Sequence, residues 1–210
     1  MDAWRLPDRK TAVFIMYELK LQKDKIRTQY IDMRRKIDEN EKSERDAKIR
    51  SLFMALVTYR YCDTLLLYVP TKREIDVMPL ALSAIAAGKK VAFPACDTSI
   101  RTMEFRYVTD PKAQLTNMNM SISEPDKSCP VYSPGTGHAV CLVPAIVYDG
   151  KGYRLGYGKG YYDRYLVNFT GTKVGFVYSD FIVDSVPRGR YDLAVDVLVT
   201  DKGVKALNAK

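Results

Sequence analysis

The sequence has a single histidine, His138, and four cysteines that stand far apart with no Cys-x-x-Cys pair. These residues cannot supply the closely spaced ligands of a structural zinc site, and they do not form the dense pattern of a disulfide-stabilised secreted domain. We therefore expect free thiols in the interior, where unpaired cysteine is most often found. The four are Cys62, Cys96, Cys129 and Cys141.

Long hydrophobic runs are also missing. The strongest apolar stretches, residues 64–69 and 139–147, are far shorter than the roughly 18 residues that a membrane-spanning helix needs. The apolar run at 12–16 is followed at once by Glu18 and Lys20, which does not fit the hydrophobic segment of a secretory signal. Internal repeats and low-complexity tracts are absent as well, which excludes a solenoid. We expect a cytoplasmic protein.

The composition that remains is that of a globular protein. The chain has 210 residues, of which 47% are hydrophobic and 28% charged, so it can build a substantial core. A chain of this length is usually one domain. We expect residues 20–210 to form that domain and residues 1–19 to be an N-terminal extension. Whether this extension is ordered or disordered stays open.

Positive charge is in excess and is concentrated near the start of the chain. The formal net charge is +8, and the first 60 residues carry 15 Lys and Arg against 10 Asp and Glu. An excess of this kind favours an anionic partner: nucleic acid, a phosphate-rich ligand or a polyanionic substrate.

The basic N-terminal part predicts an amphipathic helix. Its apolar residues recur at steps of four, three and four, which is one helical face. Lys23, Arg27 and Arg34, spaced by four and seven, form a row of cations beside that stripe. The row fits either a solvated charged face or the wall of a cleft. Nucleic-acid binding is disfavoured, because no aromatic side chains interleave with the cations and no reader motif is present. The apolar stripe consists of Ile26, Tyr30, Met33 and Ile37.

Further along the chain, helical and strand patterns alternate. A helix is predicted over residues 41–59, and near-continuous apolar strands follow, separated by helices. This order predicts an α/β fold: a single three-layer domain with a mostly parallel sheet flanked by helices, behind an N-terminal helical segment. The expected strands are 64–69, 91–95, 103–108, 139–147, 173–178 and 195–200, the expected helices are 77–87 and 161–168, and 110–137 is expected to be irregular.

A glycine-rich loop follows the strongest predicted strand. Residues 149–163 contain five glycines and the cations Lys151, Arg154 and Lys159, just before a predicted helix. Glycines let backbone amides approach phosphate oxygens closely, and the helix start and the cations add positive charge. The loop matches neither the Walker pattern nor the dinucleotide fingerprint. It therefore predicts a phosphate-binding loop of another kind, with a mobile surface turn as the alternative.

Two carboxylates are candidate ligands for magnesium. Asp163 stands at the start of the predicted helix, where its alternative role is to compensate the helix dipole. Asp196 lies within the apolar run Leu193-Ala-Val-Asp-Val-Leu-Val, where an unpaired charge would be costly. We expect the fold to bring both to one Mg²⁺ ion.

The segment Tyr153-Arg-Leu-Gly-Tyr-Gly-Lys-Gly-Tyr-Tyr-Asp-Arg164 closely resembles the signature of the 5-formyltetrahydrofolate cyclo-ligase family, also called 5,10-methenyltetrahydrofolate synthetases. The resemblance covers most of the chain, from about residue 20 up to the closing tail. Tyr157, Tyr191 and Met120 depart from the residues usual in the family. Further matching segments, in the family's order, are Lys23-x-x-x-Arg27 with Arg34-Arg35, Leu67 to Asp76, Met103-Glu-Phe, Ile122-Ser-Glu-Pro, Leu142-Val-Pro-Ala and Ala194-Val-Asp-Val.

The resemblance implies an ATP- and Mg²⁺-dependent ligase of one-carbon metabolism that closes 5-formyltetrahydrofolate to 5,10-methenyltetrahydrofolate, releasing ADP and phosphate. It implies catalytic roles for Lys159 and Arg154, and Mg²⁺ binding by Asp163 and Asp196. The implied folate contacts are Val69, Glu74, Tyr157, Gly158, Lys159, Gly160 and Tyr161. The implied ATP contacts are Lys23, Arg27, Arg154, Leu155, Gly156, Tyr157, Gly158, Lys159, Gly160, Tyr161 and Tyr162.

Two other functions stay open at this point. One is an ATP-dependent kinase or ligase acting on another pterin-like or carboxylated molecule. The other is a non-catalytic nucleotide- or RNA-binding module that uses the basic helix. The expected partner is a small-molecule folate, polyglutamylated or not, with no nucleic acid and no membrane, and a monomer is favoured.

Overall fold

The computed structural model describes residues 9–117, 123–135, 137–189 and 192–207. In chain order its elements are α1 (Arg9–Arg35), α2 (Glu39–Met54), α3 (Val57–Arg60), β1 (Thr64–Leu66), α4 (Met78–Ala86), β2 (Lys90–Asp97), β3 (Thr102–Tyr107), α5 (Pro111–Gln114), β4 (Leu115–Asn117), β5 (Ser123–Pro125), β6 (Ala139–Val143), β7 (Val147–Asp149), β8 (Arg154–Leu155), α6 (Tyr161–Leu166), β9 (Thr172–Phe176), the 3₁₀ turn η1 (Ser179–Phe181), β10 (Ile182–Val183), β11 (Val197–Thr200) and β12 (Gly203–Ala206).

The centre of the molecule is a seven-stranded sheet in the order β12-β11-β9-β6-β1-β2-β3. The five inner strands pair in parallel, and the two edge strands, β12 and β3, are antiparallel to their neighbours. Every residue of β1 and β6 is buried, as their continuous apolar sequences require. The prediction of a mostly parallel sheet flanked by helices is therefore confirmed.

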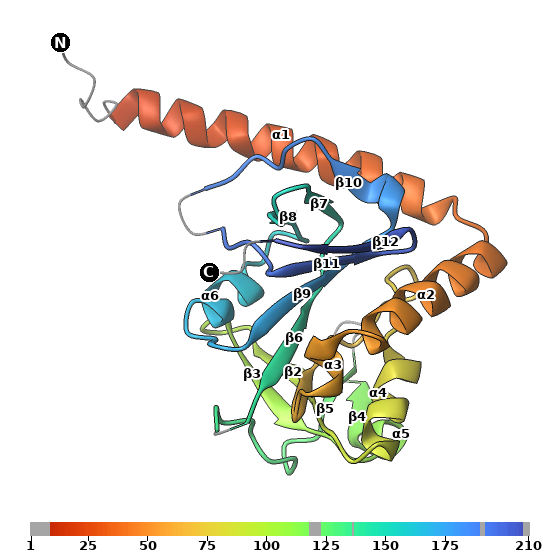
Figure 1. Ribbon diagram of the computed structural model, residues 1–210. Coiled ribbons are helices and arrows are strands. Elements are labelled where there is room, and N and C mark those ends of the chain that lie inside the picture. Colours follow the sequence, from red (N-terminus) through yellow and green to blue (C-terminus); the bar gives the residue numbers. More distant parts are fainter. Residues whose placement is uncertain (1–8, 118–122, 136, 190–191, 208–210) are drawn as a thin grey trace.

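Helices cover both faces of this sheet. The connections β1-α4-β2 and β6-α6-β9 leave the centre in opposite directions, and right-handed crossovers then place α4 and α6 on opposite faces. Figure 1 shows α2, α3 and α4 on one side of the sheet and α6 on the other. Since α6 follows the glycine-rich loop directly, the loop belongs to the β6–β9 connection, which begins at the carboxyl end of β6.

The expected strand at 139–147 is wrong in its length. β6 ends at Val143, because Pro144 has no amide hydrogen to continue the ladder, and the chain then enters a separate three-stranded sheet, β10-β7-β8. Within 110–137, expected to be irregular, α5, β4 and β5 form short elements. The sheet also continues past 195–200 through the antiparallel strand β12.

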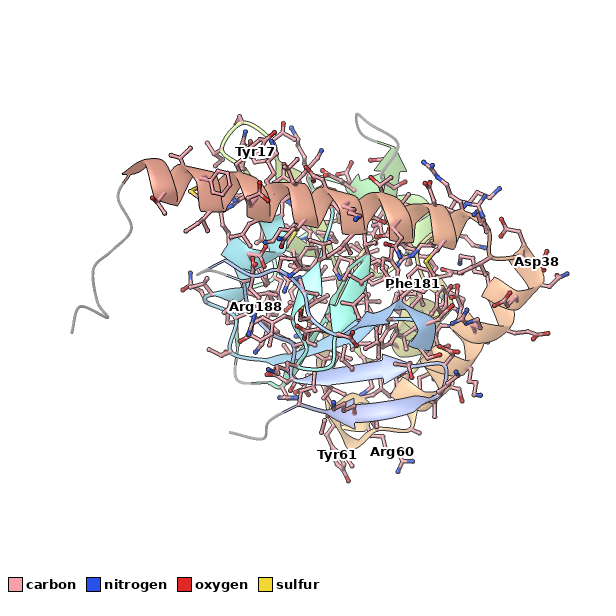
Figure 2. All side chains as sticks on the ribbon, turned by 90° about the horizontal axis from the view of Figure 1, so that it is seen from above. Tyr17, Asp38, Arg60, Tyr61, Phe181 and Arg188 are labelled. Carbon is pink, nitrogen blue, oxygen red and sulfur yellow. The ribbon has the colours of Figure 1, made fainter. Side chains whose placement is uncertain are left out.

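The expected helix at 41–59 is divided into two. α2 begins after Asp38, whose carboxylate accepts hydrogen bonds from the amides of Asn40 and Glu41, and it ends at Met54. A short break at Ala55 and Leu56 precedes α3. Figure 2 labels Asp38 at the entry of α2.

α1 lies across the top of the sheet domain, and its N-terminal half extends beyond the body of the molecule (Figure 1). The part of the expected extension over residues 9–19 is helical, while residues 1–8 lie outside the described part. Tyr30 packs edge-on against Phe181, with ring centroids 5.5 Å apart, and Figure 2 shows Phe181 beneath this helix. The predicted stripe is wrong at one position: Met33 is exposed, and Arg34 is buried in its place.

The expectation of free thiols in the interior is confirmed for three of the four cysteines. All four cysteines are free; Cys62, Cys129 and Cys141 are buried and Cys96 is half-buried. Among the described residues, no helix combines the length and apolarity that crossing a membrane requires.

Candidate active site

The glycine-rich loop joins β8 to α6 through residues 156–160. Gly158 and Gly160 have φ values of 89° and 71°, in the left-handed region that side chains other than glycine rarely adopt. Gly160 is also the residue that precedes α6. Because α6 has only six residues, the positive charge around this loop comes mainly from side chains on other elements.

Arg27 on α1 lies against this loop. Its Nε donates to the Gly156 carbonyl at 2.9 Å, and its Nη1 pairs with Asp24 at 2.5 Å. A Cβ at Gly158 would lie 3.1 Å from Arg27 Nη2. Glycine at position 158 therefore allows the guanidinium to approach the loop backbone, at the place where the sequence predicts phosphates.

Lys23, one turn earlier on α1, contacts the segment that leads to β11. Its Nζ pairs with Asp192 Oδ2 at 2.9 Å, and the same oxygen accepts a hydrogen bond from the Gly189 amide. Both side chains of the ion pair are 23% exposed. A phosphate group could compete with Asp192 for this lysine, because both are anions that ligate an ammonium group.

Arg34 completes the cationic row and fixes α1 to the sheet domain. Its Nη2 donates to the carbonyls of Ala145 and Ile146 at 3.1 and 2.9 Å, and the residue is 6% exposed. The solvated-face interpretation is therefore wrong for this residue. Arg34 and Glu74 line a cavity of about 10 Å³, which is room for about one water molecule.

The segment predicted to bind folate meets the glycine-rich loop. Glu74 is buried, and its Oε2 accepts a hydrogen bond from the Thr71 amide at 2.9 Å. Tyr157 is half exposed, and partial burial of its phenol, together with the nearby charge of Glu74, raises the pKa of Tyr157 to about 12. Val69, half-buried, follows β1 by three residues. The predicted folate acid and the predicted nucleotide loop are thus neighbours.

Arg154 and Asp163 form an ion pair at the base of the loop. The Arg154 guanidinium donates to Asp163 Oδ1 and, at 2.9 Å, to the Leu193 carbonyl. The Arg154 side chain is only 6% exposed, whereas that of Asp163 is 32% exposed. In this structure Arg154 therefore positions the first turn of α6 and the segment before β11, and its bonds to Asp163 leave the Oδ2 atom outside the pair.

Asp196 has a cation of its own. Its Oδ2 accepts from the Lys173 amide at 2.8 Å and from Lys173 Nζ at 3.0 Å, at the start of β9. The charge that the apolar sequence made costly is thus paired, and the side chain is 39% exposed. Across the described ranges, no group of three or more His, Cys, Asp and Glu residues could hold a metal.

The donor chemistry of these two aspartates still fits magnesium. Mg²⁺ prefers carboxylate oxygens and needs only one or two of them when phosphates and water complete its shell. The free oxygen of Asp163 and the half-exposed carboxylate of Asp196 meet that requirement. The structure gives the two residues different cationic partners, so their joint binding of one ion stays a prediction.

The other predicted site residues divide into exposed and buried groups. Lys159 is exposed and forms no ion pair with any described residue, so its charge is available to a ligand. Leu155 is 2% exposed and contributes to the core. The hydroxyl of Tyr162 is buried and has no hydrogen-bond partner. Tyr161 lies under Arg164, whose guanidinium carbon is 5.7 Å from the ring centroid.

Two residues that depart from the family pattern, Met120 and Tyr191, lie outside the described residues. Sequence reasoning missed the contact between Asp192 and Lys23, and the pairing of Asp196 with Lys173. The second of these had a signal, because a carboxylate in an apolar strand needs a partner. Nothing local in the sequence indicates the first, which joins positions 169 apart.

Comparison with known proteins gives consistent matches. A model of the 5-formyltetrahydrofolate cyclo-ligase family matches residues 19–201. A 5-formyltetrahydrofolate cyclo-ligase of Mycoplasma pneumoniae is 27% identical over 190 residues, covering 87% of this chain and all of that protein. A probable 5-formyltetrahydrofolate cyclo-ligase of Schizosaccharomyces pombe is 30% identical over 164 residues, covering 71% of this chain and 80% of the relative.

Solved structures agree with these matches. The NMR structure of Aquifex aeolicus 5,10-methenyltetrahydrofolate synthetase superimposes with a TM-score of 0.79 at 32% identity, covering 90% of this chain and 94% of that one. A 5,10-methenyltetrahydrofolate synthetase from Mycoplasma pneumoniae gives a TM-score of 0.68 at 26% identity, covering 85% of this chain and 98% of that one.

Proposed function

This chain belongs to the 5-formyltetrahydrofolate cyclo-ligase family, and from that membership we propose that it couples ATP hydrolysis to closure of 5-formyltetrahydrofolate, giving 5,10-methenyltetrahydrofolate, ADP and phosphate. One observation carries the proposal to the level of residues. Tyr157, in the glycine-rich loop that Arg27 contacts, lies near enough to Glu74, in the segment predicted to bind folate, to feel its charge. A nucleotide held by the loop and a folate held near Glu74 would therefore meet.

The chemistry explains why ATP is needed. A formamide carbon is a poor electrophile, and its oxygen is a poor leaving group. In the proposed reaction the formyl oxygen attacks the γ-phosphoryl group and ADP leaves. The neighbouring folate nitrogen then attacks the activated carbon, loses its proton and expels phosphate, which closes the ring.

The cations of the site suit the first of these steps. Phosphoryl transfer is catalysed mainly by positioning and by stabilising charge on the phosphoryl oxygens. Lys23 and Arg27 would bind the phosphates from the side of α1, and the exposed Lys159 would approach from the loop. Arg154 bonds both Asp163 and the Leu193 carbonyl, and so fixes the position of the loop relative to the segment before β11.

Glu74 has a binding role in this proposal. Its buried carboxylate accepts a hydrogen bond from the Thr71 amide, which fixes its direction. A carboxylate in this setting can accept hydrogen bonds from the polar N–H edge of a pterin. We propose that Glu74 orients the folate and that Val69 contacts its ring.

Magnesium would be held by Asp163 and Asp196, and when bound it would neutralise charge on the phosphate oxygens. The excess positive charge of the chain then serves ATP and the folate carboxylates rather than a nucleic acid. We keep a cytoplasmic monomer as the proposed setting.

The test is an absorbance assay for the methenyl product, with ADP measured in the same reaction. We expect product to form only when 5-formyltetrahydrofolate, ATP and Mg²⁺ are all present, with one ADP per product. Release of ADP that depends on another pterin-like or carboxylated substrate, without methenyl product, would replace this proposal with that of a different ligase or kinase.

A further inference from the structure

A small cavity lies between α1 and the segment predicted to bind folate. Its volume is about 10 Å³, and Arg34 and Glu74 contribute charged side chains to its wall. A cavity of this size holds one water molecule when at least two polar groups face it. The other lining residues are Tyr68, Ile75, Pro144, Ala145 and Phe176.

Arg34 brings an unpaired hydrogen-bond donor to this cavity. The residue is buried, and its Nε has no hydrogen-bond partner among the described residues, whereas Nη2 donates to the carbonyls of Ala145 and Ile146. The two carbonyls, together with the Phe181 ring 5.3 Å from the guanidinium carbon, hold this group in one orientation. Because a buried donor without a partner is costly, and more so on a charged group, Nε requires an acceptor.

Glu74 and Tyr68 bring acceptors to the same cavity. The Thr71 amide occupies one of the acceptor positions of the Glu74 carboxylate, which has about four. The Tyr68 hydroxyl donates to the Ile75 carbonyl at 2.9 Å, so its oxygen can still accept a bond. Burial raises the pKa of Tyr68 well above its ordinary value; the charge of Glu74 adds to this effect and that of Arg34 opposes it. Both charges therefore act close to this hydroxyl.

We propose that the cavity binds one water molecule, which accepts a hydrogen bond from Arg34 Nε and donates one to the Glu74 carboxylate, and that Arg34 is thereby a positioning residue for the folate substrate. The inference rests on the proposed function for the role of Glu74. The second hydrogen of the water would go to the Tyr68 oxygen. One molecule would then satisfy the unpaired donor and restrain the carboxylate from the side opposite to its backbone bond.

The water bridge would join the two halves of the proposed site. α1 carries Lys23 and Arg27 on the ATP side, and Glu74 lies on the folate side. A carboxylate that is already ordered binds its ligand more tightly than one that is ordered only on binding, because less conformational entropy is lost. Changing Arg34 should therefore weaken folate binding although this residue does not contact the folate. An arginine that only fixed α1 to the sheet domain would affect ATP at least as much.

The test measures Kd for 5-formyltetrahydrofolate at equilibrium without ATP, and KM for ATP in turnover. Arg34→Lys keeps a cation that can donate to the two carbonyls but has no donor at the position of Nε. It should raise the folate Kd about fivefold, as expected for one lost hydrogen bond, and should change KM for ATP less than about twofold. Adding Arg34→Lys to Glu74→Ala should cause no further rise, because the bridge is already broken.

Arg50→Lys is the matched control. Arg50 Nη1 donates to the Asp76 carbonyl at 2.7 Å, so this arginine also fixes the folate segment through a backbone carbonyl, but it does not line the cavity. Its effect on the folate Kd should be small and should multiply with that of Glu74→Ala. Effects of Arg34→Lys and Glu74→Ala that multiply in the same way, or an equal rise in KM for ATP, would overturn the positioning role.

A crystal structure of the wild-type chain tests the water itself and does not depend on any variant folding. We expect an ordered water within about 3.2 Å of both Arg34 Nε and a Glu74 oxygen. An empty cavity, or a water that contacts only one of the two residues, would overturn the inference. If the water is present and Arg34→Lys and Glu74→Ala are non-additive in folate binding, but no methenyl product forms, the inference holds and the proposed function fails.

Discussion

Replacing Lys23 with alanine tests the cationic row most sharply. In the proposed site Lys23 loses its contact with Asp192 and binds an ATP phosphate. Its removal deletes one charge-assisted contact of about 1.5–3 kcal/mol, which corresponds to a rise of roughly 10- to 150-fold in KM for ATP. KM for 5-formyltetrahydrofolate should change less than about threefold, because Lys23 contacts neither Glu74 nor Val69.

The folded state should hardly change in this variant. The Lys23–Asp192 ion pair is 23% exposed on each side, so its contribution to stability is less than about 1 kcal/mol. For a chain of this size that corresponds to a shift of about 2–4 °C in Tm at most. Asp192 keeps its hydrogen bond from the Gly189 amide.

The assay is steady-state turnover with ATP and folate varied independently, alongside a melting curve. Lys25→Ala is the matched control: it is an exposed lysine on the same helix, two residues further along and on another face. An unchanged KM for ATP in Lys23→Ala, or an equal change in both variants, would refute the placement of ATP against α1.

Three further predictions follow from the structure. Gly158→Ala should raise KM for ATP about tenfold and lower stability by about 1–2 kcal/mol, because the backbone has φ of 89° and the new Cβ would lie 3.1 Å from Arg27; kinetics and denaturant melts check both effects. Asp46→Ala should destabilise the fold by about 3–5 kcal/mol without changing either KM, since Asp46 is 1% exposed and binds a lysine, a backbone amide and a tyrosine hydroxyl; a shift in KM at unchanged stability would contradict this. Burial raises the pKa of Asp201, but a backbone amide and Arg45 outweigh it, so the pKa lies below its ordinary value. A carboxyl whose pKa is lower in the folded than in the unfolded state stabilises the protein above about pH 4, and this stabilisation is lost as the pH falls through the folded-state pKa. Asp201→Asn should therefore reduce the loss of stability between about pH 5 and 2, measured in acid melts.

The inner part of the fold could be predicted because its strands are buried on both faces. Strands such as β6 then appear as continuous apolar runs, and helices between them give the parallel order. The elements that were missed lack such a pattern. β12 is an edge strand with mostly exposed residues, and β8 has only two residues. Periodicity over so few residues carries little information.

The candidate site was predictable to the extent that it is local. The glycine-rich loop and the spacing of Lys23 and Arg27 are visible in the sequence, and the structure brings Arg27 to that loop. The partners across the fold were not predictable. Arg34 is buried because it binds carbonyl groups 111 and 112 positions away, and helical spacing alone assigned Met33 to that face. Such pairings depend on the sheet topology, which the spacing of one helix does not contain.

The central claim is that the formyl oxygen is phosphorylated and leaves with phosphate, and an isotope measurement tests it most directly. The substrate is 5-formyltetrahydrofolate labelled with ¹⁸O in the formyl group, turned over with unlabelled ATP and Mg²⁺, and the inorganic phosphate released is analysed by mass spectrometry. The account predicts one ¹⁸O atom in each phosphate formed. Phosphate without the label, with the ¹⁸O recovered in water, would contradict it.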